Sequence, residues 1–187
     1  MTAGRVVEVV TSRPFAEVLQ RELLKPIEAE LATFSPSEEL SAKMPVPYER
    51  TRAGFRPLQR ERLGTAPNPG GGLISNLDDV ARLLLLHRNG GRIGVEQFVS
   101  PEMLRTMYEP QPATPGTGYG LGFNVIERRD DGTIRIRHTG ASGTLGVIDF
   151  EKDLIVIVLT QVPQQQTLRW RNRLLQTIDE VFAPDQK

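Results

Sequence analysis

Residues 134–160 read IRIRHTGASGTLGVIDFEKDLIVIVLT and contain three successive strand patterns. Residues 134–138 alternate apolar and polar side chains, as a half-buried strand does. Residues 145–150 and 154–160 predict two further strands, and the apolar run 154–159 favours a central strand. The turn dipeptide Asp131-Gly132 precedes the first of these strands and follows a strand-like segment at 119–127. We therefore expect an antiparallel meander of about four strands.

An amphipathic helix is expected to follow the meander, from about Gln164 to Phe182. Its predicted buried stripe consists of Leu168, Leu175, Ile178 and Phe182. Its predicted solvated side carries Arg169, Arg171 and Arg173. Such a helix is suited to pack on one face of the sheet.

The segment before the meander carries helix signals and one long connection. Residues 5–11 fit a strand or a helix equally well by periodicity. Pro14 marks the start of a helix that should end near Lys25-Pro26, because the residue before proline disfavours the α conformation. Residues 35–69 contain six prolines and are expected to form a long irregular connection. Connections of this length are often functional or line a pocket.

Two further helices are expected before the sheet. Ser75 is a predicted N-cap with Asp78 three residues later, and Asn89-Gly90-Gly91 should end that helix. Ser100 should cap a second, short helix that has Pro101 in its first turn. The predicted fold class is therefore α+β. Residues 1–187 are expected to form a partial domain, with a helical region and long loop at about 1–110 and a sheet with its C-terminal helix at about 118–187.

Composition excludes several function classes. The formal net charge is zero, with 39% hydrophobic and 25% charged residues, which is typical of a soluble globular protein. The chain has no basic surplus for binding nucleic acid and no apolar run long enough to span a membrane. It lacks cysteine, and its two histidines lie 51 positions apart, so we expect no metal site. The cellular compartment stays open, because a cysteine-free chain suits both reducing and oxidising surroundings.

The candidate site is His138-Thr139-Gly140, which ends a predicted strand and precedes the small residues 141–144. Glycine at a strand end allows a substrate close to the backbone, and free N–H groups there can stabilise an oxyanion. Spacing alone places His138 on the side of Ile134 and Ile136, which favours a hydrogen-bonded core histidine. The wider sequence context changes that balance.

The chain resembles the serine β-lactamase-like and penicillin-binding-protein-like family, which includes class C β-lactamases, DD-peptidases and esterases. The likeness covers nearly the whole chain and is greatest to the esterase branch. It is carried by an ordered set of segments rather than by any one motif. The set consists of Gly4 to Glu8 with Arg13-Pro14-Phe15, Pro67 to Asp79, Asn89-Gly90-Gly91, Val99-Ser100-Pro101-Glu102, Gly118 to Phe123, His138-Thr139-Gly140, Asp149 and Leu154 to Gln161.

The family's reaction uses three motifs, and this chain contains only the last. The first is Ser-x-x-Lys, a serine nucleophile with its lysine base, and the second is Tyr-x-Asn or Ser-x-Asn. Ser41-Ala42-Lys43 is one residue short of the first motif, and no tyrosine has asparagine two positions later. In the family both motifs lie upstream of the region that this chain resembles. We therefore expect a C-terminal portion of a β-lactamase/transpeptidase-like fold.

The resemblance also implies roles for residues of the third motif. His138 takes the position of the motif's cationic residue, and Thr139 contacts the acyl or carboxylate part of the substrate. Gly140 completes the motif, and the N–H of Ala141 is one oxyanion donor. The implied substrate is a small acyl, ester or peptide-like compound, and no metal or organic cofactor is required.

Three functional hypotheses follow. The first is a portion of a serine hydrolase that does not turn over by itself. The second is a non-catalytic ligand-binding or interaction module, and the third is half of a two-piece enzyme. The family's sheet is completed by strands from its N-terminal segment, so we also expect an exposed sheet edge and self-association of this chain.

Overall fold

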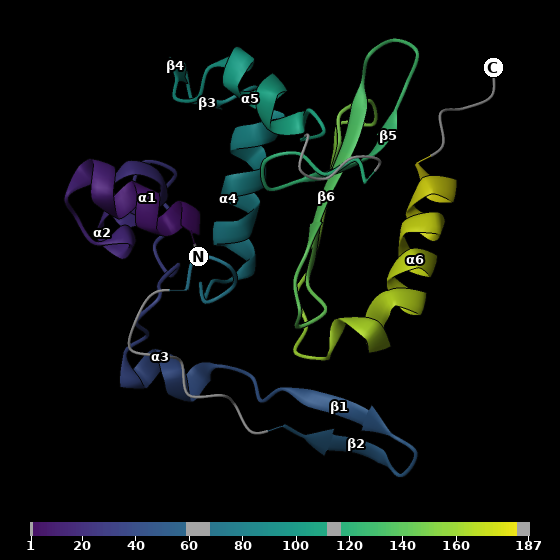
Figure 1. Ribbon diagram of the computed structural model, residues 1–187. Helices are drawn as coiled ribbons and strands as arrows, with labels where there is room; N and C mark the ends of the chain where they lie inside the picture. Colours follow the sequence, from purple (N-terminus) through teal and green to yellow (C-terminus); the bar gives the residue numbers. More distant parts are fainter. Residues whose placement is uncertain (1, 59–67, 112–116, 183–187) are drawn as a thin grey trace.

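The computed structural model describes residues 2–58, 68–111 and 117–182 (Figure 1). The first part of the chain contains helices and two small hairpins. They are α1 (Thr2–Thr11), α2 (Phe15–Leu19), the π-helix η1 (Gln20–Leu24), α3 (Glu38–Lys43), β1 (Tyr48–Thr51), β2 (Gly54–Pro57), α4 (Leu77–Arg88), β3 (Arg92–Ile93), β4 (Glu96–Gln97) and α5 (Pro101–Tyr108). The second part contains β5 (Asn124–Arg128), β6 (Ile134–Thr139), β7 (Leu145–Asp149), β8 (Leu154–Val158) and α6 (Gln164–Val181).

The central element is a four-stranded antiparallel sheet in the order β5-β6-β7-β8. Helix α4 lies on one side of the sheet and α6 on the other, while α1 and α2 lie beyond α4 (Figure 1). The predicted α+β meander and its terminal helix are therefore confirmed. The assignment of residues 1–187 to one partial domain stays a prediction.

The position of β8 corrects one expectation. Its run of apolar residues predicts a central strand, yet among the described residues β8 pairs with β7 alone and forms the edge of the sheet. All five of its residues are half-buried, and Ile155 and Ile157 pack against the core. An apolar run indicates that other elements pack on both faces of a strand. It does not indicate whether the strand has a neighbouring strand on each side.

The main core lies between the sheet and helices α4 and α5. Ile136 of β6 and Ile148 of β7 are completely buried there against Leu84, Tyr108 and Phe123. A second cluster joins α4 to η1 and the turn after it, with Leu24, Ile27 and Leu86 as members. Helix α4 thus links the helical region to the sheet through two opposite sides.

Helix α4 begins one residue after the predicted position and ends where predicted. The N-cap is Asn76 rather than Ser75, because the Asn76 side chain accepts a hydrogen bond from the Asp79 N–H at 2.8 Å. Asp79 is buried and accepts the Leu31 N–H at 2.9 Å. The predicted end of α4 at two glycines is confirmed. Gly90 and Gly91 have positive φ, and the Gly91 N–H donates to the Leu86 carbonyl. The predicted cap of α5 by Ser100 is confirmed as well.

The segment 35–69 contains more structure than predicted. Helix α3 and the β1–β2 hairpin lie within it, and residues 59–67 lie outside the described residues. Most side chains of these elements are exposed, so the sequence has no apolar periodicity there. Tyr48 N–H donates to the Gln161 carbonyl at 2.8 Å and fastens the hairpin near the start of α6. Residues 5–11, open between strand and helix, belong to α1.

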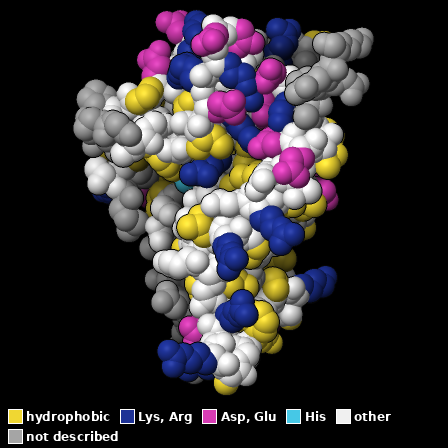
Figure 2. Space-filling view, turned by 90° about the vertical axis from the view of Figure 1, so that its right-hand side faces the viewer, with side chains coloured by type: hydrophobic (Ala, Val, Ile, Leu, Met, Phe, Trp, Pro, Cys, Tyr) yellow, Lys and Arg dark blue, Asp and Glu magenta, His cyan; other side chains and the backbone are white. Residues whose placement is uncertain are grey.

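Helix α6 follows the predicted stripe only in part, because Leu175 and Ile178 are half-buried. Thr167 and Arg171 are its buried residues, while Leu168 and Phe182 are about half exposed. Arg171 was expected in solvent and is instead 3% exposed. Figure 2 shows the side of the molecule that carries α6, with acidic and basic side chains crowded at its upper end and basic and hydrophobic ones below. In the described part of the chain, no helix combines the length and apolar character needed to cross a membrane.

The side chain of His87, near the C-terminal end of α4, is buried in the core. Its Nδ1 lies 2.8 Å from the Tyr108 hydroxyl, and its ring stands edge-on to Phe123 with centroids 4.7 Å apart. Burial lowers the pKa of His87 to about 4 and raises that of Tyr108. The imidazole is therefore neutral at physiological pH.

This burial makes stability depend on pH. The unfolded chain takes up a proton at His87 near pH 6.5, whereas the folded chain does so only near pH 4. The contribution is complete above pH 6.5 and is lost as the pH falls, by about 3 kcal/mol between pH 7 and pH 4. Urea unfolding at both pH values should show that His87→Gln removes this part of the pH dependence. The control variant His138→Gln, at an exposed histidine, should retain it.

Candidate active site

Strand β6 ends at Thr139, and residues 140–144 form the β6–β7 loop. Gly140 N–H donates to the Thr144 carbonyl at 3.1 Å, and Gly143 N–H donates to the Gly140 carbonyl at 3.0 Å. Gly143 has φ of +79°, a left-handed conformation that glycine adopts without strain. The loop is thus a tight turn whose shape depends on its glycines.

His138 is exposed, in contrast to the core histidine that its spacing favours. Alternation fixes the face to which a strand residue points, whereas burial depends on what covers that part of the face. Ile136 is completely buried, but no described element buries His138 two residues later on the same face. The Nδ1 atom of His138 lies 2.9 Å from the hydroxyl of Tyr119, which fixes the position of the imidazole. Burial raises the pKa of Tyr119, so its hydroxyl keeps its proton at neutral pH.

Thr139 points to the opposite face of β6 and contacts the start of α6. Its Oγ1 accepts a hydrogen bond from Gln164 Nε2 at 3.2 Å. The two motif side chains are therefore held from two sides, His138 by Tyr119 and Thr139 by Gln164. Neither supporting residue was singled out as a site residue by the sequence, although Tyr119 lies in a segment that carries the family resemblance.

The N–H of the peptide between Gly140 and Ala141 is the oxyanion donor that the family resemblance implies. The carbonyl of this peptide points into the turn, toward the Gly143 N–H. A trans peptide directs its N–H opposite to its carbonyl, so the Ala141 N–H points out of the turn. Among residues 2–58, 68–111 and 117–182, no acceptor binds this N–H, and Ala141 is exposed. A substrate oxygen can therefore reach it.

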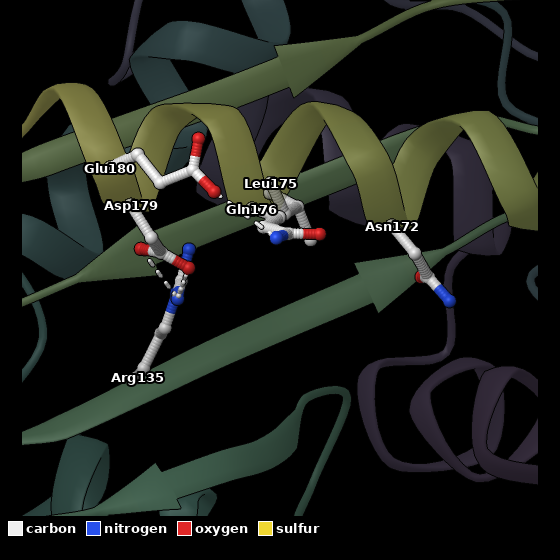
Figure 3. Close-up of a pocket in the computed structure, with 6 residues that line it drawn as sticks. All are labelled: Arg135, Asn172, Leu175, Gln176, Asp179 and Glu180. Carbon is white, nitrogen blue, oxygen red and sulfur yellow. Dashed lines mark hydrogen bonds and ion pairs between the residues drawn. The ribbon is translucent and has the colours of Figure 1, made fainter.

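A surface pocket lies elsewhere on the molecule. It is an open groove of about 580 Å³ along α6, lined by Arg135, Asn172, Leu175, Gln176, Asp179 and Glu180 (Figure 3). Arg135 points to the face of β6 opposite to His138, and it forms an ion pair with Asp179 at 2.9 Å. The groove is thus separate from the His138 site, and its one buried cation is already paired.

No metal centre accompanies the site within the described part of the chain. No three histidine, aspartate or glutamate side chains gather there in a way that could hold an ion. Asp149, which carries part of the family resemblance, is 1% exposed and lies at the other end of β7. It accepts the N–H groups of Glu151 and Lys152 at 3.1 Å each and pairs with Arg129, which is a structural role.

The family model described as Beta-lactamase matches residues 1–177, and the chain belongs to the β-lactamase family. The resemblance drawn from the sequence is therefore confirmed.

Individual proteins are similar to this chain in sequence or in fold. A protein of Escherichia coli O157:H7, assigned to the D-alanyl-D-alanine carboxypeptidases, is 26% identical over 189 residues, or 87% of this chain and 43% of its own length. Simvastatin synthase from Aspergillus terreus has a similar structure, with a TM-score of 0.71 and 17% identity over 86% of this chain and 48% of its own. The octameric penicillin-binding protein homologue from Pyrococcus abyssi has a TM-score of 0.64 and 23% identity, over 93% and 40%. This chain spans about half the length of these proteins or less.

Replacement of Gly143 should disturb the site strongly. A Cβ there would lie 2.6 Å from Thr160 Oγ1, 2.6 Å from the Val162 carbonyl and 2.7 Å from the Thr167 methyl group. We expect Gly143→Ala to cost about 2–4 kcal/mol in unfolding free energy, from backbone strain together with this contact. Gly132→Ala is the matched control, because Gly132 also has positive φ but open space around its Cβ position. Equal losses in urea unfolding would contradict the steric argument.

Proposed function

We propose that this chain supplies one wall of the active site of a serine hydrolase that works through an acyl-enzyme. The observation that carries the proposal is the end of β6, where His138 is held by Tyr119 and Thr139 is held by Gln164. The Ala141 N–H there has no acceptor among the described residues. Membership of the β-lactamase family supports this chemistry. The substrate class that fits is a small ester, amide or β-lactam.

Each residue of the wall has a distinct proposed role. The Ala141 N–H donates to the carbonyl oxygen of the substrate as negative charge develops on it. With the Tyr119 hydroxyl at Nδ1, the Nε2 atom of His138 is left to meet the leaving group or a second proton-transfer residue. Thr139 contacts the acyl portion, and Gly140 lets the substrate approach the strand.

The nucleophile must come from residues that this sequence does not contain. No Ser-x-x-Lys occurs in the 187 residues, and an oxyanion donor without a nucleophile forms no acyl-enzyme. We therefore propose that the chain acts together with a segment that carries the serine and lysine, in the same polypeptide or in a second one. By itself it binds substrate at most and does not turn it over.

A covalent probe tests this division of roles. The isolated chain should not be labelled by a fluorophosphonate, and it should hydrolyse p-nitrophenyl butyrate at the background rate. If the coding DNA upstream of Met1 encodes Ser-x-x-Lys in frame, the longer polypeptide should be labelled on that serine. In that polypeptide, His138→Ala should lower kcat/KM about 100-fold, as expected for loss of a proton-transfer or donor group. Hydrolysis by the isolated chain that depends on His138 would refute the proposal.

We propose that the edge of β8 contacts the segment that carries the serine and lysine. Leu154 to Val158 are uncharged, and one side of this strand has no partner strand among the described residues. An uncharged edge of this kind presents a row of backbone donors and acceptors to any other strand. In the isolated chain we propose that the same edge causes self-association.

Size-exclusion chromatography with light scattering tests the self-association. The mass of the isolated chain should rise with concentration, and Val156→Lys should reduce that rise, because a charge at an edge strand opposes pairing. Val95→Lys is the control, since Val95 is 86% exposed and lies in the turn between β3 and β4. A monomer at all concentrations would contradict the proposal.

A further inference from the structure

Arg171 is a buried cation beneath the candidate site. It lies in the middle of α6, is 3% exposed, and faces the β6–β7 loop. Its Nη1 atom donates to the Gly143 carbonyl at 3.2 Å and to the Thr144 carbonyl at 3.0 Å. Within the described ranges of the chain, no carboxylate forms an ion pair with it. Burial, together with the charge of Arg137, lowers the pKa of Arg171.

Such a residue is costly if its only purpose is to hold the helix against the sheet. Removing a guanidinium from water without a carboxylate partner costs several kcal/mol, and a well-packed apolar residue often serves equally well for stability. The sheet beneath α6 offers apolar neighbours for that purpose, because Leu145 and Val147 are buried there. Arginine provides several donors from one rigid planar group, which suits two adjacent carbonyl groups.

The rest of the loop is bound by the same stretch of chain. The Ala141 carbonyl accepts the Gln164 N–H at 2.9 Å. The Ser142 carbonyl accepts the Val162 N–H at 3.2 Å and the Thr160 hydroxyl at 2.7 Å. With the two bonds of Arg171, each carbonyl from residue 141 to residue 144 is bound by a group of residues 160–171. The loop is thus anchored on the side that faces α6.

We propose that Arg171 is a positioning residue for the oxyanion donor. By binding the last two carbonyls of the β6–β7 loop it fixes the turn in which the Gly140 carbonyl points inward and the Ala141 N–H points outward. The role in catalysis rests on the proposed function, since only an acyl-enzyme reaction uses this N–H. A donor that is held in place before reaction avoids the cost of reorganisation in the transition state. A shift of about 1 Å at such a donor can lower the rate about 100-fold.

The first experiment uses the isolated chain and does not depend on activity. Amide ¹H–¹⁵N spectra and order parameters are measured for the unaltered chain, for Arg171→Met and for the control Arg173→Met on the exposed side of α6. We expect Arg171→Met to shift the amides of residues 140–144 and to lower their order parameters from about 0.85 to below about 0.6. Arg173→Met should leave them unchanged. Loop amides that keep their shifts and order parameters in Arg171→Met would overturn the inference.

A second variant covers the case in which Arg171→Met does not fold. Thr160→Val removes the hydroxyl that binds the Ser142 carbonyl from the same segment, and it leaves the buried stripe of α6 intact. It should shift the same five loop amides by a smaller amount, with the midpoint of urea unfolding nearly unchanged. Unchanged loop amides in this folded variant would count against anchoring of the loop by residues 160–171.

If the coding DNA upstream of Met1 encodes Ser-x-x-Lys in frame, the catalytic part is tested in that longer polypeptide, with p-nitrophenyl butyrate as substrate. Arg171→Met should lower kcat about 10-fold to 100-fold and change KM less than about twofold, because the donor acts mainly in the transition state. A change confined to KM, or to the unfolding midpoint, would show a structural role only. If the unaltered polypeptide is inactive, the proposed function fails, and the loop spectra still decide whether Arg171 orders the loop.

Discussion

Strand β6 has two chemically different faces, and most of the structure depends on how each face is covered. Ile136 points into the core beneath α4, where it is completely buried. Arg135 points the other way, to Asp149 at 3.7 Å and to Asp179 of α6 at 2.9 Å. A slip of one residue would exchange these faces and bury the arginines in the apolar core. The alternation therefore fixes the register that brings His138 and Thr139 to the end of the strand.

Burying charged side chains on one side of the sheet costs desolvation free energy, which their ion pairs offset only in part. Asp149 and Arg135 are both buried, and the Nε atom of Arg135 has no hydrogen-bond partner in the described structure. Buried ion pairs are weak contributors to stability, but the loss of one partner leaves an uncompensated charge. We interpret this network as a constraint on where α6 lies, because Asp179 meets both Arg135 and Lys152. The placement of α6 in turn brings Gln164 and Arg171 to the β6–β7 loop.

Local signals in the sequence predicted those parts of the fold that local chemistry decides. The glycines after α4, the cap at Ser100 and the strands β6 to β8 were predicted because turn residues and alternation act over a few positions. The N-cap of α4 lies one residue after the predicted position, because Ser75 and Asn76 are both good caps and local sequence does not distinguish them. The edge position of β8 depends on strand order, which periodicity does not contain.

Arg171 shows why the candidate site was only half predictable. The motif itself is visible in the sequence, but its support comes from a helix on which charged residues were assigned to solvent. The two buried residues of α6, Thr167 and Arg171, are polar, so a search for apolar periodicity does not find them. What selects an arginine there is the set of loop carbonyls that need donors, and those exist only once the loop has turned against α6. A buried polar residue is informative because its partners have to be nearby, and here those partners are the backbone of the site.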